Sequence, residues 1–163
     1  MILAAGLTPA WQQILRFDSL ALGEVNRARE AHWCASGKVF NVAIALAQLG
    51  AECRMVSPIG TNVCEEVERE LAGLGVRSRL VVCDTPTRVC TTLLESASGT
   101  VTELVENARP LEAAAIERLT KLFAAEAPAA SVVVLTGSLP SGTPATFYRD
   151  LAAAFNLTPT AEA

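Results

Sequence analysis

The feature that most constrains the fold of this chain is an alternation of short apolar runs, rich in β-branched residues, with longer segments of helical periodicity. This alternation is typical of α/β proteins, in which right-handed helical crossovers join the strands of a parallel sheet. The sequence therefore predicts a parallel α/β sheet. Its predicted strands are Ile2–Ala5, Glu52–Pro58, Arg79–Cys83 and Ser131–Thr136, and its predicted helices are Val39–Leu49, Asn62–Leu74, Leu111–Ala125 and Pro144–Ala154.

Two segments interrupt the alternation, Gln13–Trp33 and Thr87–Glu106. The second contains the turn Ser98-Gly99 between Thr-rich and Val-rich stretches, a pattern typical of antiparallel strands. We expect both segments to leave the main sheet and to serve either as a lid over a site or as an interface with a second subunit. At the other end, Phe155–Ala163 is a short polar tail where the alternation would place another strand, so the predicted sheet is incomplete.

Charge and composition argue against several classes of protein. The formal net charge is −4 and the 13 basic residues are scattered, so there is no basic stripe of the kind that follows a nucleic-acid backbone. No apolar run reaches the roughly 18 to 20 residues of a membrane span and no export leader is visible, which predicts a cytoplasmic protein without membrane partners. The five cysteines include no C-x-x-C pair, and His32 with Cys34 offers too few ligands for zinc, so reduced thiols and no metal site are predicted.

Chemistry is best supported at the start of the helix predicted from Val39. Ser36-Gly37-Lys38 precedes this helix, whose free backbone N–H groups and positive dipole end favour an anion. The segment is not a P-loop, because its pattern requires other residues at His32 and Val39. Asn41, on the first turn, is placed to hydrogen-bond a ligand hydroxyl. The alternatives are an ordinary Ser cap for the helix and a bond from Asn41 to a neighbouring loop.

Two further positions could contribute to the same site. The strand ending at Thr136 runs directly into Gly137-Ser138, which places both residues at the carboxyl edge of the sheet, where ligands bind in open α/β folds. Arg88 opens the second interrupting segment and could reach into a cleft. A plain strand-to-helix turn and a surface ion pair are the alternatives for these two positions.

Taken together, these motifs resemble the PfkB family of carbohydrate kinases, and within it the branch of 1-phosphofructokinase and tagatose-6-phosphate kinase. The resemblance runs from about Ile2 to Leu151 and rests on Gly23-Glu24-Val25-Asn26-Arg27, Ser36-Gly37-Lys38-Val39-Phe40-Asn41-Val42-Ala43, Thr87-Arg88, Gly99-Thr100-Val101-Thr102-Glu103 and Gly137-Ser138-Leu139-Pro140. It implies a ribokinase-like, three-layer, Rossmann-type parallel sheet, incomplete here, with a small β-lid formed by about residues 13–33 and 87–106. It also implies ATP-dependent phosphorylation of a sugar phosphate, with Mg as the accompanying ion.

The resemblance also assigns roles to individual residues. Gly37 and Asn41 match positions that touch sugar hydroxyls, whereas Lys38, Arg88 and Arg27 match positions near the phosphate of the sugar. Ser138 falls in the same pocket. Lys and Arg suit this role because both supply charge-assisted donors. The partners implied are a sugar phosphate and either a second copy bound through the β-lid or a complementary kinase half.

The chain also departs from the family pattern. The early aspartate that grips the sugar is replaced by Gln12, and Ser36 and Val39 replace two glycines beside the ligand. The Gly-Ala-Gly-Asp stretch that supplies the anion hole and catalytic aspartate would lie beyond Ala163, in family members roughly twice this long. We therefore expect residues 1–163 to form the N-terminal part of the kinase domain, with no catalytic residue, little ATP binding and no activity alone.

Three functions remain open at this point. The first is the sugar-phosphate-binding portion of a kinase. The second is a non-catalytic binding or interaction module derived from such a kinase. The third keeps the family but replaces the substrate with an unphosphorylated sugar, against which Lys38 and Arg88 argue.

Overall fold

The computed structural model describes residues 1–154, and the predicted tail 155–163 lies outside them. Four parallel strands form the first sheet in the order β5-β4-β1-β8, which places β1 in its interior. Each strand is short and rich in aliphatic residues, as expected for strands that helices cover on both faces. Their bounds are β1 Ile2–Ala5, β4 Cys53–Gly60, β5 Arg77–Cys83 and β8 Val132–Leu135.

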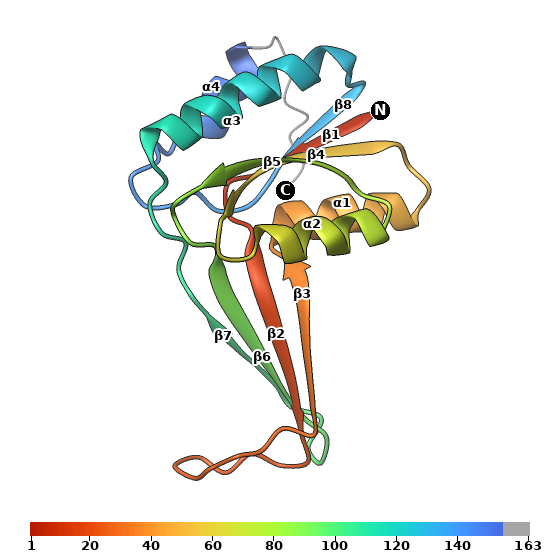
Figure 1. Ribbon diagram of the computed structural model, residues 1–163, viewed down its shortest axis with the longest axis vertical. Helices are drawn as coiled ribbons and strands as arrows, with labels where there is room; N and C mark the ends of the chain where they lie inside the picture. The colour runs from red at the N-terminus through yellow and green to blue at the C-terminus, as the bar shows by residue number, and fades with distance from the viewer. Residues whose placement is uncertain (155–163) are drawn as a thin grey trace.

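Helices cover both faces of this sheet and complete a three-layer sandwich (Figure 1). One layer contains α1 (Lys38–Gln48) and α2 (Cys64–Gly73); the other contains α3 (Ala113–Glu126), which the one-turn helix η1 (Ala127–Ala129) extends, and α4 (Phe147–Ala154). Alternate residues of the strands enter the two cores, as the two-residue period of a strand requires. The first core contains Ala4, Met55, Phe40 and Leu71, and the second contains Leu3, Ala5, Val56, Leu119 and Phe123.

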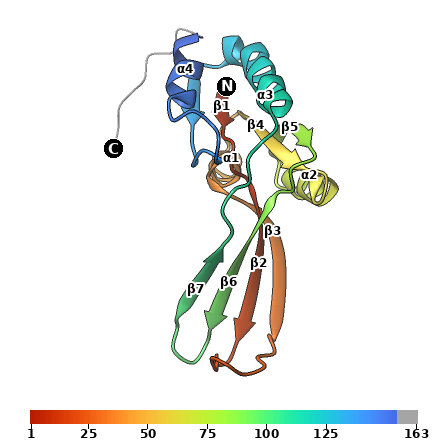
Figure 2. The ribbon, with the colours of Figure 1, turned by 90° about the vertical axis from the view of Figure 1, so that its left-hand side faces the viewer.

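A second sheet of four strands extends away from the sandwich in the order β3-β2-β6-β7 (Figure 2). Strand β2 pairs antiparallel with β3 and parallel with β6, and β6 pairs antiparallel with β7. The two segments that interrupt the alternation lie largely in this sheet. Its strands are β2 Ala10–Phe17, β3 Glu30–Ser36, β6 Arg88–Glu95 and β7 Val101–Val105.

The base of the second sheet is fastened to the sandwich. Trp11 stacks on Trp33, with ring centroids 6.0 Å apart, and Trp11 also packs against the core beneath α1 and α2. Glu70 of α2 accepts a hydrogen bond from the backbone N–H of Ala35 at 2.6 Å. This bond occupies a donor on edge strand β3 that would otherwise be open to another strand.

The fold class predicted from the sequence is confirmed, with small shifts at the ends of elements. Helix α3 begins at Ala113 instead of Leu111, because Leu111 packs against the core and Glu112 bonds to Thr85. Helix α4 begins at Phe147 instead of Pro144, because residues 140–146 form turns first. None of the helices within residues 1–154 is long and apolar enough to cross a membrane.

Candidate functional site

The ends of β1 and β8 meet the start of α1 where the two sheets join. Thr8, which follows β1, is buried, and its hydroxyl donates to the carbonyl of Ser138 at 3.1 Å while the Ser138 hydroxyl donates back to it at 3.3 Å. A Cβ on Gly37 would lie 2.8 Å from the Thr8 carbonyl oxygen. The fold therefore brings together two predicted site residues, Gly37 and Ser138, around one buried threonine.

Tyr148 of α4 holds the same edge of the sheet through two hydrogen bonds to the backbone. Its hydroxyl donates to the carbonyl of Thr136 at 3.0 Å and accepts the N–H of Leu7 at 3.3 Å. Burial raises the pKa of the Tyr148 hydroxyl, so it stays neutral and keeps its proton for the Thr136 bond. Gly137 follows at a φ of 98°, a backbone conformation that favours glycine.

The start of α1 faces this junction with open donors. Gly37 is its N-cap, with a φ of 96°, and no side chain caps the helix, so the alternative of a capping serine is wrong. Lys38 and Asn41 are exposed on the first turn, and neither side chain bonds to another described residue. The end of the helix therefore presents a cation, an amide and free N–H groups, a combination that suits an anion carrying hydroxyl groups.

Arg88 lies at the junction as predicted, but its guanidinium is already engaged. It donates to the carbonyl oxygens of Glu106 at 3.1 Å and of Thr8 and Pro9 at 3.4 Å each. Thr8 and Pro9 lie in the segment that joins β1 to β2, whereas Glu106 lies in the segment that joins β7 to α3. Arg88 is therefore a brace of the junction in this structure, with spare N–H groups for a ligand because a guanidinium has five.

The position where the family has a sugar-gripping aspartate is part of a polar ladder. The Ser36 hydroxyl donates to the side-chain oxygen of Gln12 at 2.7 Å, and the Gln12 amide nitrogen donates to the Thr92 hydroxyl. The ladder crosses three strands, β3, β2 and β6, and Thr92 at its end is buried. Gln12 thus holds neighbouring strands together and does not present a free carboxylate.

Arg27 is not brought near the other predicted residues. It lies in the loop between β2 and β3, which Figure 1 places at the far end of the second sheet. The loop is held by Asn26, whose side chain bonds to the backbone of Ala21 and Glu24. Arg27 is exposed there, so within one chain it cannot meet a ligand at the start of α1.

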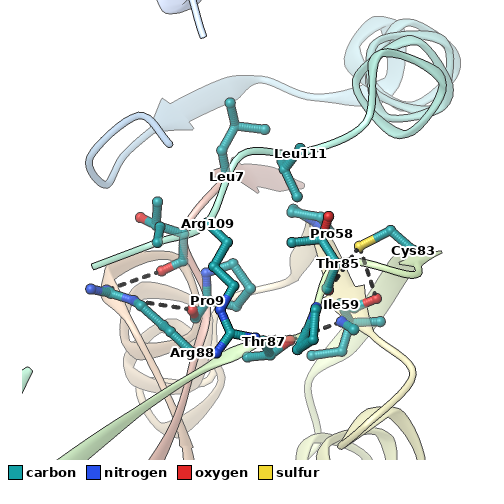
Figure 3. A pocket seen from close by; sticks show the side chains of 14 residues that line it. Leu7, Pro9, Pro58, Ile59, Cys83, Thr85, Thr87, Arg88, Arg109 and Leu111 are labelled. Atoms are coloured by element: carbon teal, nitrogen blue, oxygen red, sulfur yellow. Dashed lines mark hydrogen bonds between the residues drawn. The ribbon is translucent and has the colours of Figure 1, made fainter. Parts of the chain in front are cut away.

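A pocket of about 20 Å³, room for roughly one water molecule, lies on another side of the junction (Figure 3). Thr87, which lines this pocket, is held by a clamp in which the Asn62 side chain bonds to both its N–H (3.0 Å) and its carbonyl (3.3 Å). The Thr87 hydroxyl in turn accepts the N–H of Gly60 at 2.8 Å. Arg109 also lines this pocket.

Sequence reasoning missed Thr8, Tyr148 and Arg109. The partners of Thr8 and Tyr148 lie up to 141 residues away along the chain, a pairing that no local pattern encodes. Arg109 falls after the last β-type stretch, in a segment without periodicity. Only its position at the junction pocket in the fold singles it out.

Two of the three aspartates within residues 1–154 are engaged in local contacts. Asp18 pairs with Arg29 in a loop, and Asp150 bonds to Thr146 and Arg149 on the surface of α4. The hydrogen bond from Thr146 contributes most to lowering the pKa of Asp150. Residues 1–154 contain no group of three or more His, Cys, Asp or Glu side chains that could hold a metal ion.

Comparison with known proteins places this geometry in a family. A model described as "pfkB family carbohydrate kinase" matches residues 7–158. A 1-phosphofructokinase from Haloferax volcanii is 32% identical over 143 residues, which are 87% of this chain and 46% of the relative.

Solved structures share the fold. Phosphofructokinase-2 from Escherichia coli in complex with fructose-6-phosphate gives a TM-score of 0.86 at 22% identity, covering 95% of this chain and 51% of that one. A possible 1-phosphofructokinase from Thermotoga maritima gives a TM-score of 0.86 at 18% identity, covering 96% and 51%. The chain thus spans about half the length of the relatives it matches.

Proposed function

The chain belongs to the pfkB family of carbohydrate kinases, and we propose that it is the sugar-phosphate-binding portion of an ATP-dependent kinase that phosphorylates a hydroxyl of a hexose phosphate. The observation that carries this proposal is the convergence of Gly37 and Ser138 on Thr8, beside the uncapped start of α1 and the free side chain of Lys38.

The proposed binding mode follows from the donors at this junction. The sugar lies against Gly37 and Asn41, since an amide can both donate to and accept from hydroxyl groups. Its phosphate lies toward Lys38, Ser138 and the spare N–H groups of Arg88, because ammonium and guanidinium groups form charge-assisted hydrogen bonds to phosphate. Fructose 1-phosphate, fructose 6-phosphate and tagatose 6-phosphate are the substrates proposed.

ATP and Mg belong to the proposed kinase as a whole. Residues 1–154 contain no cluster of carboxylates that could hold a metal ion, so we assign the nucleotide site and the catalytic base to polypeptide corresponding to the other half of the relatives. For this reason the 163-residue chain alone is expected to transfer no phosphate.

A second copy is the proposed partner of the β-lid, formed here by the second sheet. Trp33, Val101, Leu104 and Val105 of this sheet are 46–59% exposed, and burying such side chains favours association. Arg27 could reach a phosphate only from a neighbouring subunit, which agrees with pairing through this sheet. Analytical ultracentrifugation tests this: a monomer at micromolar concentration would argue against the pairing.

Lysine offers a matched test of the sugar-phosphate site, because the chain contains only Lys38 and Lys121. Calorimetry should show fructose 6-phosphate or fructose 1-phosphate binding more tightly than fructose. Lys38→Gln should weaken binding of the phosphate esters about tenfold, the worth of about one charge-assisted hydrogen bond. Lys121→Gln, on the surface of α3 and paired with Glu117, is the control and should change nothing.

Two outcomes would decide against the proposal. If fructose binds as tightly as its phosphates, the site serves an unphosphorylated sugar. If no sugar binds, the alternative of a non-catalytic interaction module gains support, and the engaged Gln12 amide is the observation that favours it. Turnover of ATP by the purified chain would refute the expected lack of activity.

A further inference from the structure

The linker between β7 and α3, residues 106–112, crosses the junction of the two sheets and is held at both ends. At its start, the Glu106 carboxylate accepts the N–H of Val89 at 3.0 Å. At its end, the Glu112 carboxylate accepts both the N–H of Thr85 at 2.9 Å and its hydroxyl at 2.8 Å. The Pro110 carbonyl accepts a bond from the same hydroxyl at 3.1 Å. The fold therefore holds the linker backbone on both sides of Arg109.

Arg109 is an exposed residue that lines the junction pocket. Figure 3 shows its side chain extending from the linker into the pocket, which Pro9, Thr87 and Arg88 also line. The residue is solvent-accessible, so a ligand can approach it from outside. Because the enclosed space holds roughly one water molecule, a larger group would sit at the mouth of the pocket, over the guanidinium.

The guanidinium of Arg109 has no partner within residues 1–154. Most arginines there bond to a carboxylate or a carbonyl, whereas Arg27, Arg69 and Arg109 do not. Of these three, Arg109 is the one that lines the junction pocket. The carboxylates on its own linker, Glu106 and Glu112, already accept hydrogen bonds from elsewhere.

Glu106 and Glu112 keep their negative charge when they accept these bonds, but neither is paired with the Arg109 guanidinium. Arg88, the neighbouring cation, is tied to backbone carbonyls, and the walls of the pocket include the apolar side chains of Pro58, Ile59 and Leu111. A guanidinium beside apolar walls, with unused donors in a rigid fork, suits an anion that offers several oxygens. Phosphoryl groups and carboxylates meet this requirement.

We propose that Arg109 is an anion-binding residue of this kinase fold, which together with Arg88 holds the phosphoryl group of the sugar phosphate at the mouth of the junction pocket that both residues line. The identity of the ligand as a sugar phosphate rests on the proposed function; the anion site itself does not. A nucleotide carries the same phosphoryl chemistry as a sugar phosphate, so the test includes both ligands.

The test uses the ¹⁵N-labelled 163-residue chain, with NMR of the arginine side-chain Nε–Hε signals. Inorganic phosphate is titrated against potassium chloride at equal ionic strength, followed by fructose 6-phosphate, fructose and ATP. The Arg109 signal should shift saturably with phosphate, and Arg109→Gln should weaken phosphate binding at least tenfold. Arg69→Gln removes an equally unpaired charge from the exposed face of α2 and should leave the affinity within twofold of the parent.

The outcomes separate this inference from the proposed function. Phosphate affinity that Arg109→Gln leaves unchanged overturns the inference, as does an Arg109 signal that chloride moves equally. If Arg109 binds phosphate while fructose and fructose 6-phosphate bind equally, the proposed function fails and the anion site stands. Tighter binding of ATP overturns the sugar-phosphate assignment. Arg109→Lys keeps the positive charge but lacks the planar guanidinium donors, so it should bind phosphate with intermediate affinity. This variant also serves as a control in case the Gln variant misfolds.

Discussion

Replacing Thr87 with valine should loosen the clamp that attaches the second sheet to the sandwich. The change keeps the shape of the side chain but removes the hydroxyl that accepts the Gly60 N–H at 2.8 Å. Both residues are buried, and the Thr87 hydroxyl is the acceptor that the fold provides for the Gly60 N–H. The Gly60 N–H is thus left without a partner, the condition that makes loss of a buried hydrogen bond costly.

The expected loss of stability follows from this geometry. An unsatisfied buried donor costs about 1–3 kcal/mol, so we expect Thr87→Val to lower the free energy of unfolding by about 2 kcal/mol. In a domain of this size that corresponds to a fall in Tm of about 4–8 °C. Thr87→Ser is the matched control, because it keeps the hydroxyl and loses only one buried methyl group, at about 0.8 kcal/mol.

Urea unfolding followed by circular dichroism measures both variants, and amide hydrogen exchange at Gly60 supplies the local readout. The Gly60 amide should exchange faster in Thr87→Val than in Thr87→Ser or the parent, since only the valine variant lacks the hydroxyl that accepts the Gly60 N–H. If Thr87→Ser proves as destabilising as Thr87→Val, or if Gly60 keeps its protection in the valine variant, the hydrogen bond does not carry the stability assigned to it.

Three further predictions concern other parts of the molecule. Gly37→Ala should cost about 3 kcal/mol in urea unfolding, because φ is 96° and the new methyl group would meet a backbone carbonyl oxygen at 2.8 Å; an unchanged midpoint would rule out the strain. Glu126→Gln should cost about 2 kcal/mol, less than the 3–5 kcal/mol of a fully buried ion pair, because its partners Arg54 and Arg79 are 33% and 58% exposed; a loss below 0.5 kcal/mol would contradict this. Burial raises the pKa of the Cys83 thiol above its ordinary value of 9.0, so the stability it contributes is complete below pH 9 and is lost as the pH rises beyond it; a Tm series from pH 7 to 10 should fall less in Cys83→Ala than in the parent.

The sequence predicted the parallel sheet well because its strands are short apolar runs, and the two inner ones, β1 and β4, are almost wholly buried. The predicted strand from Ile2 to Ala5 agrees with β1, and α1 begins within one residue of the expected start. Ends that depend on long-range contacts were less accurate. Helix α3 starts late because Glu112 bonds to Thr85, 27 residues earlier, and periodicity carries no trace of such a bond.

The candidate site divides in the same way. Motifs fixed the local positions of Gly37 and Ser138, but not the buried threonine between them, since its contact with Ser138 spans 130 residues. Arg88 was expected to reach into a cleft or to form a surface ion pair, and only the fold shows that it donates to three backbone carbonyls. The isolation of Arg27 likewise depends on the length of the second sheet and not on sequence spacing.

The stacked pair of Trp11 and Trp33 gives the protein a built-in optical probe. These are the only tryptophans in the chain, so its indole fluorescence and much of its near-ultraviolet dichroism originate at one point, the base of the second sheet. One ring is anchored against the sandwich and the other is 46% exposed on an edge strand. Rotation of the second sheet against the sandwich would change the contact of Trp11 with the core, and the resulting spectral change could be followed in stopped-flow time without any label.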